Sequence, residues 1–292
     1  MRQWLLVLLM LALGKAAAVP NGATRQAGKI VMDRYLPEGE PVASVVVCPG
    51  GSYHWLDLDA EGQKVGKWLS DNGIAAYVLH YRVAGVPSFI THYRLVFRGH
   101  RHPDMLCDVQ QAIRSVREEQ TGPVGVMGFS AGGHLALSAG EYAGTDFNRD
   151  RYGIESPYSL RPDFIAAVYP VITLTDERYV HKRSRKGLLG EVSRLPMRDS
   201  LSLERHVPAD MPPVFLVNCE DDPIVDWHNS VLMDSALTAA GAAHLYIRYA
   251  RGGHGFGADP AKMGPETAAW QNDFLEWFQQ WKSTYGNDRA RY

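Results

Sequence analysis

The chain has 292 residues, of which 46% are hydrophobic and 21% charged, a composition that excludes a disordered chain or a repeat array. Its 30 basic and 32 acidic residues give a formal net charge of -2, which excludes the basic footprint of a nucleic-acid-binding protein, so we expect no nucleic-acid partner. A chain of this length can bury a large core without disulfides or metals.

The first residues form a unit of their own. Arg2 precedes an apolar run from Trp4 to Leu13, and the small residues Ala16 to Ala18 follow it. The run is about ten residues long, whereas a membrane-spanning helix needs about 20. We therefore predict a signal peptide over residues 1–18, and a secreted or periplasmic protein that does not stay in the membrane after cleavage. Residues 19–28 are predicted to be a linker, and residues 29–285 a single domain.

Short apolar runs alternate with helical patterns through this domain. Parallel strands covered by helices on both faces have this alternation, and each strand is then continuously apolar. We predict an α/β fold with a mostly parallel sheet. The expected strands are 42–48, 74–80, 124–129, 164–169, 214–218 and 245–249, and the expected helices 104–119, 130–141, 230–240 and 267–281.

Two long segments interrupt the alternation. Residues 83–102 are rich in Arg, His and aromatic residues, and residues 173–208 mix basic residues with a few leucines. Loops of this length in a compact fold are usually functional. We expect residues 83–102 to form a lid-like insertion over the active edge of the sheet.

Ser130 lies in the pentapeptide Gly128-Phe129-Ser130-Ala131-Gly132, directly after an expected strand and at the start of an expected helix. This is the setting of the nucleophile elbow of the α/β-hydrolase fold, in which a serine sits on a tight strand-to-helix turn. We predict that Ser130 is a nucleophile. The alternative is a glycine-rich turn with a purely structural role.

A serine hydroxyl needs a base to take its proton, and in this fold the acid and the histidine follow the serine in that order. Asp221 and Asp222 follow the strand at 214–218, and His254 lies in a glycine-rich turn after the next strand. We predict His254 as the base. Asp222 is preferred to Asp221 as the acid that orients it.

The third requirement of acyl transfer is an oxyanion hole, a set of N–H groups that binds the developing negative charge. Gly50, Gly51 and Ser52 follow the first buried strand, where this fold places such a loop. We expect the backbone N–H of Ala131 to supply one donor and that of Gly51 or Ser52 another.

Several other residues receive structural interpretations. His134 follows Ser130 by four residues and is predicted to be a hydrogen-bonded packing residue, and the aromatic stripe of the last helix is predicted to be core rather than a sugar platform. Cys48, Cys107 and Cys219 are interpreted as small buried residues, with a bridge between Cys48 and Cys219 left open. No metal or other cofactor is expected.

Several motifs together resemble one family. The segments Pro49-Gly50-Gly51, Tyr81-Arg82-Val83, Gly128 to His134, Glu220-Asp221-Asp222 and Gly252 to Gly257 are similar to those of bacterial acetyl-xylan-esterase-like, or BD-FAE-type, α/β-hydrolases. The resemblance implies a carbohydrate esterase that removes acetyl or related acyl groups from plant polysaccharide, with Ser130, His254 and Asp222 as its triad. Ser52 departs from the pattern, because many relatives have a third glycine there.

Two other functions use the same fold. A serine peptidase of the prolyl-oligopeptidase type has the same triad, but this chain lacks room for a propeller domain. A non-catalytic binding protein would usually lack a triad member. The sequence does not name the sugar or the acyl group, and it gives no oligomeric state.

Overall fold

The computed structural model describes residues 30–90 and 99–289. The expected signal peptide, the expected linker and part of the 83–102 insertion lie outside the described residues. Within the described part, one seven-stranded sheet organises the domain, with the strand order β1-β3-β2-β4-β5-β6-β7. The strands are β1 (Met32–Tyr35), β2 (Ala43–Cys48), β3 (Ile74–Leu79), β4 (Val124–Phe129), β5 (Ile165–Val168), β6 (Val214–Cys219) and β7 (His244–Tyr249).

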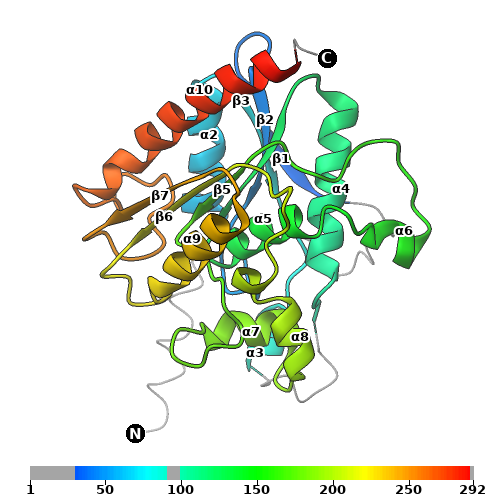
Figure 1. The fold of residues 1–292 in the computed structure, drawn as a ribbon, viewed down its shortest axis with the longest axis vertical. Helices are drawn as coiled ribbons and strands as arrows, with labels where there is room; N and C mark the ends of the chain where they lie inside the picture. The colour runs from blue at the N-terminus through cyan, green and yellow to red at the C-terminus, as the bar shows by residue number, and fades with distance from the viewer. Residues whose placement is uncertain (1–29, 91–98, 290–292) are drawn as a thin grey trace, which may run out of the picture.

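Helices cover both faces of the sheet (Figure 1). The long helices pack on its faces, and the short ones lie in the connections. The long ones are α2 (Lys64–Asp71), α4 (Asp104–Glu119), α5 (Ala131–Glu141), α9 (His228–Ala240) and α10 (Trp270–Arg289). The short ones are η1 (Asp59–Gln63), α3 (Val86–Ile90), α6 (Phe147–Tyr152), α7 (Lys182–Leu189), α8 (Leu195–Ser200), η2 (Leu203–Arg205) and η3 (Thr267–Ala269).

The strand sequences explain this two-sided packing. Successive side chains of a strand point to opposite faces, so Val45 and Val47 of β2 pack in the core beneath α2 and α10, whereas Val46 and Cys48 pack in the core beneath α4, α5 and α9. Every residue of β2, β3, β4 and β6 is buried. Their continuous apolar runs follow from burial on both faces.

The predicted α/β fold is confirmed. All pairs of neighbouring strands are parallel except β1 and β3, which are antiparallel. The six expected strands agree with the observed ones to within one residue, and α4 has the predicted bounds. The edge strand β1 was not predicted, because two of its four residues are charged, none is fully buried, and they give no apolar run.

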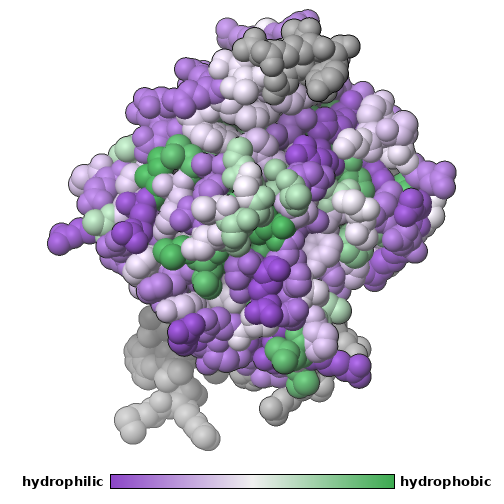
Figure 2. Space-filling model, viewed as in Figure 1, coloured by the Kyte–Doolittle hydropathy of each residue, from purple (hydrophilic) through white to green (hydrophobic). Residues whose placement is uncertain are grey.

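The two long segments supply the helices at one end of the sheet. Helix α3 comes from residues 83–102 and helices α7 and α8 from residues 173–208, and the three lie together at the lower end of the view in Figure 1. The face drawn in Figure 2 is mainly hydrophilic, with hydrophobic residues in small separate groups. Within the described residues, no helix has both the length and the apolar character needed to cross a bilayer.

The cysteines are buried and unbridged. Cys48 ends β2 and Cys219 ends β6, so both lie at the same edge of the sheet, but β4 and β5 lie between them. Three strand spacings separate them by about 14 Å, whereas a disulfide needs α-carbons within about 7 Å. The bridge that the sequence left open is therefore wrong, and the interpretation as buried thiols is confirmed.

Candidate active site

Ser130 stands at the turn between β4 and α5, and its backbone is left-handed, with φ at 53° and ψ at -119°. The flanking glycines are required by close packing. A β-carbon at Gly128 would lie 2.0 Å from the carbonyl oxygen of Gly132, and one at Gly132 would lie 2.0 Å from that of Cys48. The strained turn holds the Ser130 side chain at the carboxyl edge of the sheet.

His254 and Asp222 reach Ser130 from loops after β7 and β6. The Nε2 atom of His254 lies 2.9 Å from Oγ of Ser130, and its Nδ1 atom lies 2.6 Å from Oδ2 of Asp222. A carboxylate only accepts, so Nδ1–H donates to Asp222 and leaves Nε2 free to accept the serine hydroxyl. The structure brings the three predicted residues together in hydrogen-bond contact.

The two adjacent aspartates have different partners. Asp222, whose side chain is 1% exposed, also accepts the backbone N–H groups of Ile224 and Val225 through Oδ1. Asp221 instead accepts the N–H groups of Gly252 and Gly253 through its own Oδ1. Asp222 therefore orients the imidazole, whereas Asp221 shapes the glycine turn that leads to it.

The loop after β2 lines the same pocket as Ser130, through Gly51 and Ser52. Gly51, Ser52 and Tyr53 have positive φ angles of 131°, 56° and 62°. Within the described part of the chain, the N–H groups of Gly51, Ser52 and Ala131 donate to no acceptor, whereas the N–H of Gly50 donates to the Glu61 carboxylate. The three unpaired donors are those expected for the oxyanion hole.

His134 supports this loop from α5. Its Nε2–H donates to the carbonyl of Leu201 at 2.9 Å, and its Nδ1 accepts the hydroxyl of Tyr53 at 2.8 Å. Burial lowers the pKa of His134 to about 4, so the ring is neutral at pH 7. The prediction of a hydrogen-bonded packing residue is confirmed.

No sequence pattern pointed to Glu61 as a residue of the site. It lies in η1, a short polar helix, and its side chain is buried beneath the oxyanion loop. Its carboxylate accepts the N–H of Gly50 at 2.6 Å and the hydroxyl of Tyr169 at 2.9 Å. Burial raises the pKa of Glu61 to about 7.

A pocket of about 170 Å³ opens over Ser130 and His254. Trp55, Arg183 and Ile224 contribute to its wall, and Trp55 is 38% exposed. The guanidinium of Arg183 lies 6.0 Å from the centre of the Trp55 ring. The pocket mouth thus combines an exposed aromatic ring with a cation.

The described part of the 83–102 insertion lies beside this pocket. The ring of Phe89 in α3 contacts His54 and Trp55, with ring centres 5.3 and 6.0 Å apart. Of the two histidines near the end of the insertion, His100 pairs with Asp104 and His102 packs against Phe147. Across the described residues, no three His, Cys, Asp or Glu side chains are grouped to hold a metal ion.

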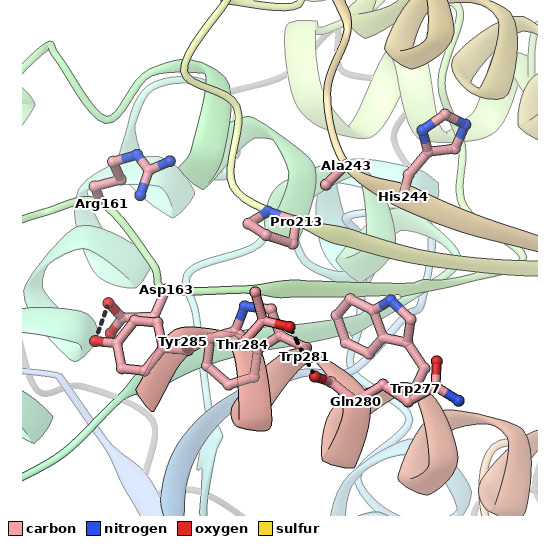
Figure 3. Close-up of a pocket in the computed structure, with 10 residues that line it drawn as sticks. All are labelled: Arg161, Asp163, Pro213, Ala243, His244, Trp277, Gln280, Trp281, Thr284 and Tyr285. Carbon is pink, nitrogen blue, oxygen red and sulfur yellow. Dashed lines mark hydrogen bonds between the residues drawn. The ribbon is translucent and has the colours of Figure 1, made fainter. Parts of the chain in front are cut away.

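A larger cavity, of about 450 Å³, lies at the opposite edge of the sheet (Figure 3). The rings of Trp277 and Trp281 on α10 face Pro213 and His244, which lie at the amino ends of β6 and β7, and the hydroxyl of Tyr285 donates to Asp163. The aromatic stripe predicted as core is therefore divided. Its first residues are fully buried, whereas Trp277 and Trp281 are partly buried and line this cavity.

A family model, BD-FAE, matches residues 32–237. The chain belongs to the BD-FAE family. The match covers the elbow, the oxyanion loop and the paired aspartates, and His254 follows it. The α/β-hydrolase fold is likewise shared with esterases of known structure.

Two relatives have the names of enzymes that act on xylan or acetylxylan. The chain is 32% identical to an acetylxylan esterase of Xylanibacter ruminicola over 86% of this chain and 49% of that protein. It is 30% identical to endo-1,4-beta-xylanase B of Butyrivibrio fibrisolvens over 72% of this chain and 32% of that one. The chain thus spans half or less of the length of these two relatives.

Among solved structures, the acetyl ester-xyloside bifunctional hydrolase of Caldicellulosiruptor lactoaceticus superposes with a TM-score of 0.74 at 30% identity. The alignment covers 91% of this chain and 93% of that one.

Proposed function

We propose that this protein is a serine carboxylesterase that removes acetyl groups from plant cell-wall polysaccharide or its oligosaccharides. The observation that carries the proposal is the chain of contacts from Asp222 through His254 to Ser130, which opens into a small pocket beside unpaired N–H donors. The acetyl specificity is supported by two similar proteins, one named an acetylxylan esterase and the other an acetyl ester-xyloside bifunctional hydrolase.

Acylation begins at Ser130. His254 takes the proton of the Ser130 hydroxyl as Oγ attacks the ester carbonyl, and Asp222 stabilises the imidazolium that forms. The N–H groups of Ala131 and of Gly51 or Ser52 bind the oxyanion. Collapse of the tetrahedral intermediate breaks the ester bond, and His254 gives its proton to the leaving sugar hydroxyl.

Deacylation repeats these steps with water as the nucleophile. His254 takes a proton from a water molecule, the resulting hydroxide attacks the acetyl-Ser130 carbonyl, and acetate leaves as the proton returns to the Ser130 oxygen. The residues present supply every proton transfer, so the reaction as proposed uses no cofactor.

The pocket size favours a short acyl group. Sites that enclose drug-sized ligands usually have volumes of roughly 300–1,000 Å³, whereas this pocket has about 170 Å³. That space suits an acetyl group better than a bulky aromatic acyl group such as feruloyl. The sugar would then contact the pocket mouth, where Trp55 and Arg183 lie.

Export is part of the same proposal. Residues 1–18 have the charged start, apolar run and small residues of a cleavable signal, and a polysaccharide substrate lies outside the cytoplasm. N-terminal sequencing of the protein recovered outside the cytoplasm tests this. A mature chain that starts near residue 19 supports export, and an intact Met1 in that fraction contradicts cleavage.

The function is tested with wild type and Ser130→Ala on acetylated xylo-oligosaccharides, with acetate release as the readout. We expect Ser130→Ala to lose at least about 10³-fold in kcat, as losses of a triad nucleophile do, and to lose labelling by a fluorophosphonate probe. Feruloylated and methyl-esterified polysaccharides and a peptide amide serve as competing substrates. Faster hydrolysis of any of them than of the acetyl ester would overturn the proposed specificity.

A further inference from the structure

Glu61 is a buried carboxyl group that the proposed mechanism does not use. It comes from η1, between β2 and α2, and is 3% exposed. Both of its carboxylate oxygens are engaged: Oε2 accepts the N–H of Gly50, and Oε1 accepts the hydroxyl of Tyr169. It also lines the pocket over Ser130.

The contact with Gly50 reaches the oxyanion loop. A β-carbon at Gly50 would lie 2.6 Å from Oε2 of Glu61 and 2.9 Å from the β-carbon of Ser130, so the carboxylate and the serine approach the same backbone position. Gly50 precedes the predicted donors Gly51 and Ser52. The Glu61 carboxylate therefore fixes the start of the loop that carries those donors.

The contact with Tyr169 reaches the histidine turn. The hydroxyl oxygen of Tyr169 accepts the N–H of Gly257 at 2.9 Å, three residues after His254. The Tyr169 ring lies 4.5 Å from the imidazole of His254 and 4.6 Å from the ring of Phe256, measured between ring centres. The turn that carries His254 therefore packs against Tyr169, whose hydroxyl donates to Glu61.

We propose that Glu61 is a positioning residue that joins the oxyanion loop to the histidine turn, through its hydrogen bonds to Gly50 and Tyr169. The inference rests on the proposed function, because it gives a role to Glu61 only if Ser130 and His254 perform the chemistry. In this role the Glu61 carboxylate holds the oxyanion loop and the turn that carries His254 at a fixed position relative to each other.

The ionised form of Glu61 fits this role. Both partners donate to the carboxylate, so a proton on either oxygen of Glu61 weakens the hydrogen bond that this oxygen accepts. Burial and the nearby Asp57 raise the pKa of Glu61 to about 7, opposed by His254 and by the two hydrogen bonds.

The other charged or titratable groups that line the pocket are Asp57, Arg183 and His254. Lys262, which does not line it, pairs with Asp57. Because Glu61 titrates near neutral pH in this setting, activity should fall on the acidic side as it gains a proton.

The test variant is Glu61→Gln, which keeps the shape of the side chain but cannot accept two hydrogen bonds from these donors. On p-nitrophenyl acetate we expect kcat to fall about 10- to 100-fold. This is no more than the fall in kcat that follows removal of one oxyanion-hole donor. KM should change by less than about twofold. The acidic limb of kcat/KM should become shallower, because the side-chain amide of the variant does not titrate. Rates are normalised to active sites titrated with a fluorophosphonate, so misfolded protein does not enter kcat.

Two further variants separate positioning from general destabilisation. Glu141→Gln neutralises a buried carboxyl group at the far end of α5, away from Ser130, and should keep the wild-type kcat and pH profile. Tyr169→Phe keeps the ring but removes the hydroxyl, and combined with Glu61→Gln it should lower kcat by less than the product of the single effects.

The outcomes distinguish the inference from the proposed function. A Glu61→Gln variant with wild-type kcat and a wild-type acidic limb overturns the role of Glu61, and fully multiplicative effects with Tyr169→Phe overturn the link to the histidine turn. A Ser130→Ala variant that keeps esterase activity instead overturns the proposed function, whatever Glu61→Gln does.

Discussion

Oδ2 of Asp222 lies 2.6 Å from Nδ1 of His254, whereas the neighbouring Asp221 accepts the backbone N–H groups of Gly252 and Gly253, in the turn before that histidine. Adjacent carboxylates at the end of β6 thus hold the same histidine in two ways. One fixes the tautomer and orientation of the ring, and the other fixes the path of the backbone that carries it.

The two aspartates should therefore respond differently to the same substitution. Asp222→Asn presents an amide to Nδ1 and favours the wrong tautomer, so we expect kcat to fall about 10³- to 10⁴-fold. Asp221→Asn keeps an oxygen that can accept the two N–H groups, so kcat should fall less than about tenfold. Steady-state kinetics on p-nitrophenyl acetate measure both. A larger loss for Asp221→Asn would mean that Asp221 is the acid that serves His254.

Trp55 should matter for sugar esters and not for small esters. Its partly exposed ring lines the pocket and can stack on a sugar. We expect this stacking to stabilise the complex about as much as a pair of aromatic rings does, by about 0.5–1.5 kcal/mol. Trp55→Ala should raise KM about two- to tenfold for acetylated xylo-oligosaccharides. For p-nitrophenyl acetate, KM should stay within about twofold of the wild-type value.

Tyr158→Ala removes a comparably exposed ring that does not line the pocket and is the matched control. Equal changes of KM on both substrates in Trp55→Ala would show that the ring shapes the acyl pocket rather than binding sugar.

The three thiols should be unreactive in the folded protein. Cys48, Cys107 and Cys219 are at most 1% exposed, and burial raises the pKa of the Cys107 thiol to about 11 and that of Cys219 to about 12. Because the thiolate is the reacting form, DTNB at pH 8 should titrate no thiol in native protein and three in 6 M guanidinium. A count of one thiol in guanidinium without reductant would reveal a disulfide and contradict the buried, unpaired state.

The sequence predicted best what depends on local pattern. The all-apolar strands and the glycines around Ser130 have signals within a few residues, because two-sided burial requires continuous apolar runs and the elbow requires Gly128 and Gly132. The resemblance to BD-FAE proteins was confirmed by the family model.

What the sequence missed depends on contacts between distant segments. Glu61 meets Tyr169 across 108 positions of the chain, and neither residue has a neighbouring pattern that indicates the contact. The edge strand β1 is short and half polar and is defined by its pairing with β3. The strand order also separates Cys48 from Cys219, which spacing along the chain could not show.

His134 should make the folded state sensitive to acid. Its pKa is lowered to about 4 by burial, against about 6.5 in the unfolded chain, so between these values the unfolded state binds more protons. The free energy of unfolding therefore falls as the pH drops from 6.5 toward 4, by on the order of 2 to 3 kcal/mol from this residue. The carboxyl group of Glu61, with its raised pKa, acts in the opposite direction over nearly the same range, so the wild-type curve alone cannot isolate His134.

The comparison of His134→Gln with wild type removes the shared contributions. Urea unfolding at pH 7.5 and 4.5 should show that the variant, although less stable at pH 7.5, loses less stability on acidification, by on the order of 2 kcal/mol. His206→Gln, at a histidine whose side chain is 44% exposed, is the control for replacing an exposed histidine. If His134→Gln and wild type lose equal stability between the two pH values, the ring of His134 is not held neutral by burial. The bond that it accepts from Tyr53 would then need another explanation, because a protonated ring cannot accept at Nδ1.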